Sequence, residues 1–255
     1  MILILLVIFV LLLLLVGGDR GVISLVTLVG NILTFLFSIY LMALGINPIL
    51  ITLIACLIIS SITLFYQNQN NEKTKAAFIS VVSVSLLLLL FMVIFLTRMD
   101  LYGLSEMEEQ SELSLYYSFN IHINMELILL TVVIICFIGA IMDTAMAVSS
   151  GVYEVHVNHP DLKKAELYKS GLSIGADILS TTLNTLFFAY CGEALIMFLY
   201  LIKYNYSMVK ILNSKAFLLN FTTIVMSAIG CILIIPICAK ITATIIEEGR
   251  KDGEK

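Results

Sequence analysis

The chain has 255 residues, of which 60% are hydrophobic and only 13% charged, with a formal net charge of -4 and a mean hydropathy of +1.07. A soluble domain is about half apolar and a quarter charged, so this composition excludes an ordinary soluble protein and indicates an integral membrane protein. The small negative charge does not indicate binding to nucleic acid.

Seven apolar segments are expected to cross a bilayer as helices, because an apolar layer about 30 Å thick takes roughly 20 helical residues. Their runs are long and unbroken, whereas a membrane β-barrel needs short alternating strands. The predicted fold is therefore all-α, a polytopic transmembrane helical bundle of about seven spans in a single membrane domain, 1–255. The segments are Ile2–Val16, Val22–Leu44, Pro48–Tyr66, Ala76–Leu96, Glu126–Gly151, Gly171–Cys191 and Ala216–Ile246.

The first segment is short for a span. It lacks the basic region and small-residue cleavage site of a signal peptide, so we expect a retained helix. Thr27, Asn31, Thr34 and Ser38 mark one face of the second segment. A helix-contact stripe explains that face better than a pore lining.

Three connecting segments are long enough to have their own character. Residues 97–125 are expected to form an acidic external loop. Residues 152–170 are expected to form a cytoplasmic connector with a short amphipathic helix, which begins at an N-cap pattern between Asn158 and Asp161. Within an external segment, 192–215, the apolar run Ala194–Tyr206 is too short to span and is expected to lie in the interface.

Basic residues predict the orientation, because short cytoplasmic loops carry an excess of Lys and Arg. An external N-terminus and a cytoplasmic C-terminus place ten of the fourteen basic residues in the cytoplasm. These ten are Arg20, Lys73, Lys75, Lys163, Lys164, Lys169, Lys240, Arg250, Lys251 and Lys255.

Two acids lie inside apolar segments, where a charged side chain is costly and usually functional. Asp143 is in the fifth segment beside Thr144, and Asp177 is in the sixth, on one helix face with Thr181 and Asn184. Both acids are expected roughly 10 Å inside the cytoplasmic boundary, on consecutive antiparallel helices. Two facing carboxylates could share a proton or hold a cation, so these five residues form the predicted ion- or proton-coupling site. Alternatively, the acids are hydrogen-bonded structural residues.

Small residues recur at helical spacing around these acids. Gly139, Ala147 and Gly151 are on the face of Asp143, and Gly171 and Gly175 precede Asp177. Such residues allow helix backbones to approach closely in lipid, so we predict helix packing there.

No motif for chemistry or for a cofactor stands out. The five cysteines have no metal-ligand spacing, and His156 with His159 is better explained as a solvated loop pair than as a metal site. There is no phosphate-binding glycine motif and no protease signature. We therefore expect no enzyme, no metal and no cofactor.

Several segments resemble the YibE/F family of membrane proteins, most closely its smaller YibF-type members. They are 17–21 (GGDRG), 45–50 (GINPIL), 139–146 (GAIMDTAM), 159–162 (HPDL) and 169–171 (KSG) through 184–186 (NTL). The resemblance covers nearly the whole chain. It implies a multi-pass protein of the bacterial cytoplasmic membrane, with a second family subunit or another copy of itself as partner.

The stretch from Asp143-Thr144 to Asp177 and Thr181 is also similar to the SecD/SecF branch of RND transporters. That likeness implies an RND-half-like six-helix core plus an extra N-terminal helix, with Asp143 as the proton-carrying acid. Asp177 departs from it, because the SecF branch carries a basic residue there. The predicted function is a permease-like subunit that uses an H⁺ or Na⁺ gradient for transport or translocation. The alternative is a non-transporting scaffold or assembly factor.

Overall fold

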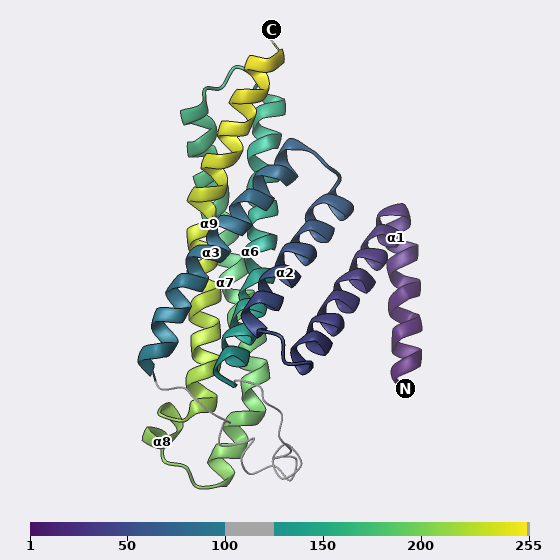
Figure 1. The fold of residues 1–255 in the computed structure, drawn as a ribbon. Coiled ribbons are helices and arrows are strands. Elements are labelled where there is room, and N and C mark those ends of the chain that lie inside the picture. Colours follow the sequence, from purple (N-terminus) through teal and green to yellow (C-terminus); the bar gives the residue numbers. More distant parts are fainter. Residues whose placement is uncertain (100–124, 254–255) are drawn as a thin grey trace.

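The computed structural model describes residues 1–99 and 125–253, and every regular element in these ranges is a helix (Figure 1). Among the described residues, six helices are long and apolar enough to cross a membrane, which confirms the all-α membrane bundle. In chain order the elements are α1 (Ile2–Ala43), α2 (Pro48–Ser61), the π-helix η1 (Ile62–Tyr66), α3 (Glu72–Met99), α6 (Met125–Asn158), α7 (Lys164–Lys203), α8 (Met208–Leu212) and α9 (Lys215–Gly253).

The first two expected spans are joined in α1, which is bent sharply at Gly18. Gly18 has φ 52° and ψ -133°, a conformation open to glycine because it has no Cβ. The chain doubles back there, so α1 has two arms (Figure 1). At Gly21 a Cβ would overlap the carbonyl of Leu13, which shows how closely the arms approach. The seven expected segments thus correspond to six long helices, one of them in two arms.

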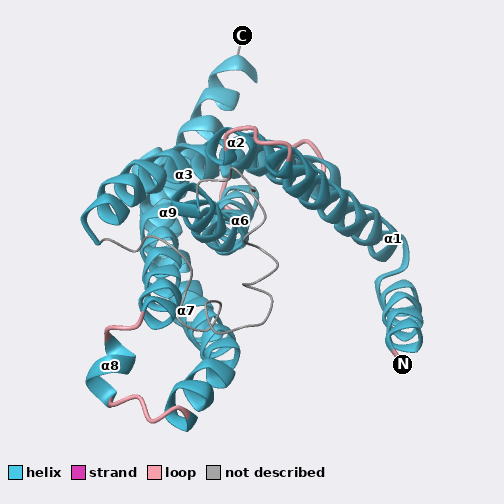
Figure 2. Ribbon diagram, turned by 60° about the horizontal axis from the view of Figure 1, so that its bottom comes forward, coloured by secondary structure: helices cyan, strands magenta, loops and turns pink. Residues whose placement is uncertain are grey.

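The helix α9 lies at the centre of the bundle and packs against α3, α6 and α7. Phe137, Ile141, Leu88 and Ile234 are among the large side chains buried between these helices. The helix α1 lies at the edge, where its second arm packs against α2 and η1 (Figure 2). Large apolar side chains cover the outer surface of the helices, as contact with lipid tails requires.

Glycines set the distances between α7 and its neighbours. A Cβ on Gly171 would lie 2.7 Å from both Ala239 and Val152, and one on Gly151 would lie 2.9 Å from Ile174. At Gly175 a Cβ would overlap Ile235 of α9. The close approach expected at these three glycines is therefore present.

The same expectation does not hold at Gly139 and Ala147. In the part of the chain that the structure describes, nothing lies within 4 Å of a Cβ built on Gly139, so no neighbouring helix packs against that side of it. Ala147 lies on the wall of an open pocket. Their spacing along α6 matches that of Gly151, but of these three residues Gly151 is the one that lies against Ile174 of α7.

The expected connector at 152–170 is not a separate amphipathic helix. The helix α6 continues to Asn158 and α7 begins at Lys164, so only five residues join them. The backbone N–H of Lys163 donates to Glu166 Oε2 at 2.9 Å, so α7 is capped two residues beyond the expected Asp161. With 34 and 40 residues, α6 and α7 are longer than an apolar layer requires, and they therefore continue beyond it.

The expected interfacial helix at Ala194–Tyr206 is instead the end of α7, which continues without a break to Lys203. The short α8 and the start of α9 pack against it through a second apolar cluster, formed by Ala194, Met197, Leu201, Ile211 and Ala216. This α7–α8–α9 hairpin lies at the end opposite the C-terminus (Figure 1). Most of the expected acidic loop at 97–125 falls outside the described residues, since the structure does not describe 100–124.

Basic side chains gather at the bundle end that holds the η1–α3 turn, the α6–α7 connection and the end of α9, which we call the basic end. Arg250 joins the end of α9 to the α6–α7 connection. Its Nη1 donates to the Leu162 carbonyl at 2.9 Å, and its Nη2 lies 2.9 Å from His156 Nδ1. Lys164 Nζ lies 3.5 Å from Glu247 Oε2, which joins α7 to α9.

Replacing Gly175 with alanine should lower the stability of the bundle by about 1–3 kcal/mol, because the added methyl group must displace Ile235. Gly139→Ala is the matched control. It adds the same group to open space and should leave stability unchanged or raise it by up to about 1 kcal/mol. Thermal unfolding in detergent micelles measures both. Equal melting temperatures for the two variants would contradict the close α7–α9 contact.

Candidate functional site

Asp143 of α6 points away from the centre of the bundle, into a pocket of about 410 Å³. Its side chain is exposed in the isolated chain, whereas Thr144 and Ala145 beside it are buried. The walls of the pocket come from η1, the η1–α3 turn, the start of α3 and one face of α6. The other lining residues are Thr63, Leu64, Gln67, Asn68, Lys73, Met142, Met146, Ala147 and Ser150.

The η1–α3 turn supplies the polar side of this pocket. Gln69 has a positive φ of 65°, which reverses the chain just after α2 and η1. Asn68 Nδ2 donates to the Thr63 carbonyl at 3.0 Å, and Thr74 Oγ1 accepts from the Asn71 N–H at 2.9 Å. These bonds satisfy backbone groups that the helix ends would otherwise leave without a partner. They also stabilise the turn that places Gln67, Asn68 and Lys73 in the same pocket as Asp143.

The π-helix η1 lies on the opposite wall from Asp143. π-helical turns are rare and are often found at functional sites, because they change the direction of side chains within a helix. Thr63 in this turn accepts a 3.0 Å hydrogen bond from Asn31 Nδ2 of α1, and Gln67 Nε2 donates to Ser24 Oγ at 3.2 Å. The polar face of α1 thus contacts η1, as a helix-contact stripe would.

The pocket brings together a carboxylate, an ammonium, two amides and two hydroxyls within an apolar bundle. Lys73 lines the same pocket as Asp143, but no ion pair joins these two described residues. Within residues 1–99 and 125–253, no three His, Cys, Asp or Glu side chains lie together as metal ligands would. A single carboxylate beside one ammonium and several neutral donors and acceptors can exchange a proton or hold a monovalent cation with water.

Thr144, which sequence reasoning placed beside Asp143 in the site, faces the opposite way. Its Oγ1 donates to the Ala140 carbonyl at 2.9 Å and lies 3.5 Å from Cys231 Sγ of α9. The side chain is almost fully buried. Adjacent residues on a helix differ by about 100° in direction, so Thr144 stabilises the α6–α9 contact and does not reach the pocket.

The structure does not bring Asp177 to Asp143. No residue of α7 lines the Asp143 pocket, and the α7 side that meets α6 and α9 carries Gly171, Ile174 and Gly175. Asp177, Thr181 and Asn184 are exposed on another side of α7. One chain therefore does not form the expected two-carboxylate site.

A sequence model of the YibE/F-like protein family matches residues 5–248, almost the whole chain. The chain belongs to the YibE/F-like family. No curated protein and no solved structure matches it. The comparisons do not support the likeness to SecD/SecF transporters, so it carries no further argument for this YibE/F-like protein.

Sequence reasoning found the acid of the pocket but missed its other polar residues. In the sequence, Lys73 serves only to predict orientation, and Gln67 and Asn68 lie between the apolar segments Pro48–Tyr66 and Ala76–Leu96. The sequence feature that could have pointed to these residues is the polar run 67–75, which directly follows the apolar segment Pro48–Tyr66. Only the packing of α2 and α3 against α6 shows that this run faces Asp143.

If the pocket holds water, Ser150→Cys should react with a membrane-impermeant maleimide added at the basic end, because Ser150 lines the pocket. Ser149→Cys is the matched control, since the neighbouring Ser149 is completely buried. Peptide mass spectrometry separates these labels from those on the native thiols. Equal labelling of the two variants, or labelling of Ser149→Cys alone, would contradict the position of the pocket.

Proposed function

We propose that this YibE/F-like protein is a non-enzymatic, permease-like membrane subunit in which Asp143 takes up and releases H⁺ or Na⁺. The observation that carries the proposal is the polar pocket around Asp143 in an otherwise apolar bundle. A charged carboxylate exposed to lipid would destabilise the protein. An acid in a polar pocket within the membrane, by contrast, is typical of ion pathways.

The position of the pocket supports access from one side of the membrane. It lies against the η1–α3 turn, which is part of the basic end. We infer that the basic end is cytoplasmic, because Lys and Arg are concentrated on the cytoplasmic side of membrane proteins. The N-terminus and the α7–α8–α9 hairpin are then external, and a bacterial cytoplasmic membrane is the proposed location.

The exposed polar side of α7 favours a second candidate function, assembly with another membrane chain. The hydroxyls of Thr181 and Thr185 bond to carbonyls of their own helix, at 2.9 Å each. Asp177 and Asn184 have no hydrogen-bond partner among the described residues, although both are exposed on a spanning helix. Polar side chains at such positions commonly bond to a neighbouring helix.

A second copy of this chain is the occupant that we propose for this side of α7. Asn184 carries both a donor and an acceptor, so two parallel copies of α7 can pair the same residue with itself. Hydroxyls and amides of one copy can also donate to Asp177 of the other. A different family subunit is the competing occupant.

Asp143→Asn should abolish ion coupling, because an amide neither carries a proton nor holds a cation in the same way. A hydrophobic carbodiimide should label Asp143 in reconstituted protein, and the label should disappear in the variant. Asp161→Asn, which changes an exposed loop acid, is the control. In cells that lack the native gene, Asp143→Asn should insert and assemble but leave the deletion phenotype. Full activity of this variant would show that ion coupling through Asp143 is wrong and would favour the assembly function.

Asp177→Leu combined with Asn184→Leu should separate copies of the chain without unfolding them, because both side chains are exposed in the single chain. Ser83→Leu, which changes an exposed hydroxyl of α3, is the control and should leave the assembly intact. Native mass spectrometry from mild detergent measures the number of copies. A complex with unchanged mass in the double variant would contradict the proposed interface. A wild-type complex with a different membrane chain would identify a heteromeric partner instead.

A further inference from the structure

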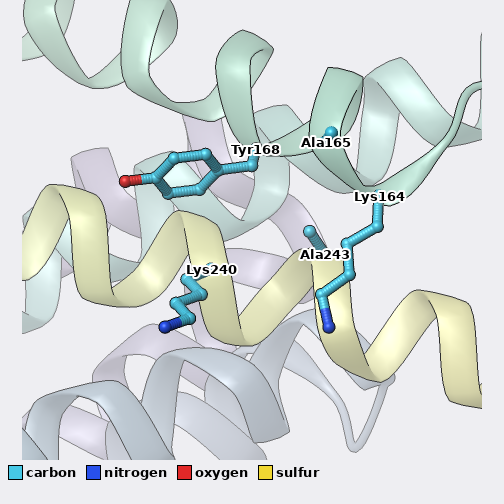
Figure 3. Close-up of a pocket in the computed structure, with 5 residues that line it drawn as sticks. All are labelled: Lys164, Ala165, Tyr168, Lys240 and Ala243. Atoms are coloured by element: carbon cyan, nitrogen blue, oxygen red, sulfur yellow. The ribbon is translucent and has the colours of Figure 1, made fainter.

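A second pocket, of about 440 Å³, opens between α7 and α9 near the basic end. Lys164, Ala165 and Tyr168 line it from α7, and Lys240 and Ala243 from α9. Figure 3 shows the two lysine side chains extending in the same direction, with Tyr168 on the other side of the pocket. This pocket shares no residue with the pocket of Asp143.

Lys240 is the unusual residue of this pocket. It lies seven residues before Glu247 on α9, about 10 Å further into the bundle. Its side chain is exposed, and no carboxylate or hydrogen-bond acceptor partners it among the described residues. An ammonium at this depth normally extends toward the interface and meets an anion there.

Lys164 is the second cation of the pocket. It forms an ion pair with Glu247 at 3.5 Å, with both side chains about 40% exposed (39% and 41%). An ion pair this exposed is weak, so Lys164 keeps most of its capacity to attract another anion. The two lysines therefore place positive charge at two levels of one groove.

The floor between the lysines is apolar and narrow. Ala165 of α7, which is exposed, and Ala243 of α9, which is buried, line the pocket with short side chains that leave space between the helices. Most of the exposed lining is apolar, which a soluble anion would not require. Tyr168 adds an aromatic ring with a hydroxyl, a side chain typical of the level of lipid headgroups.

We propose that this groove binds an anionic phospholipid. Lys164 and Lys240 hold the phosphate beside Ala165, Tyr168 lies beside the glycerol region, and an acyl chain continues from there along the α7–α9 groove into the bilayer. Basic pockets between spanning helices at the cytoplasmic surface are suited to acidic lipid headgroups. The proposal is independent of the role of Asp143.

The experiment uses purified full-length protein in detergent, with phosphatidylglycerol and phosphatidylcholine of equal chain length as probes. Native mass spectrometry measures the retention of each lipid. Wild-type protein should retain phosphatidylglycerol in preference to phosphatidylcholine. Lys164→Gln with Lys240→Gln should weaken phosphatidylglycerol binding about thirtyfold, since each lysine near a membrane surface contributes about fivefold.

Two further variants distinguish a site from general charge attraction. Lys75→Gln with Lys169→Gln removes the same charge from exposed positions outside the pocket and should change binding less than twofold. Ala165→Leu keeps every charge but fills the groove, and should also weaken phosphatidylglycerol binding. Because Ala165 is exposed, the larger side chain should not unfold the protein. Unchanged melting temperatures verify that each variant is folded.

Three results would overturn the proposal. Equal losses in the two lysine pairs would show general charge attraction. Equal retention of the two lipids would show that the headgroup is not recognised. Displacement of phosphatidylglycerol by water-soluble glycerol 1-phosphate would show a site for free phosphate, whereas a lipid site should resist it because the apolar groove contributes to binding.

Discussion

The close contact of α7 with α6 and α9, made possible by Gly151, Gly171 and Gly175, is the constraint on which the rest of the structure depends. Between lipid tails there is no hydrophobic force that favours one helix partner over another, so close packing of small residues decides which faces meet. Once these glycines face α6 and α9, the directions of all other α7 side chains are determined. Asp177 and Asn184 are then on an exposed side, and Ala165 forms one wall of a groove.

Asp143 shows how an apolar bundle accommodates an acid. The packing of α6 against α9 uses the side of Thr144 and Ala145, so Asp143 points toward η1 and the start of α3. There lies η1, the one π-helical turn among the described residues, followed by the polar η1–α3 turn in which the chain reverses direction. Hydrogen bonds within that turn hold it in place, with the amides of Gln67 and Asn68 and the ammonium of Lys73 in the pocket of Asp143. The low dielectric around such a group makes these polar neighbours much more important than they would be in water.

The two pockets and the exposed side of α7 differ in the neighbour that each requires. The Asp143 pocket is polar and lies between α6 and the η1–α3 turn, so it suits water and a small ion. The Lys164–Lys240 groove is mostly apolar with two lysines at its edge, so it suits an anionic lipid. The Asp177 side of α7 has polar groups without partners among the described residues, so it suits another protein chain. The packing of the bundle thus separates Asp143 and Asp177, although they lie on consecutive helices in the sequence.

The sequence by itself determined the membrane class, the positions of the apolar segments and the existence of two intramembrane acids, because each depends on composition and on runs of local residues. The sequence also shows the glycines at which α1 bends (Gly18) and α7 packs closely (Gly175). It does not show which residues pack against them. Only the tertiary structure decided that Asp143 and Asp177 lie on separate surfaces and that Lys73 and Asn68 join Asp143. The reason is physical: helical periodicity defines the faces of each helix, but the rotation of one helix against another is set by side chains distant in the chain.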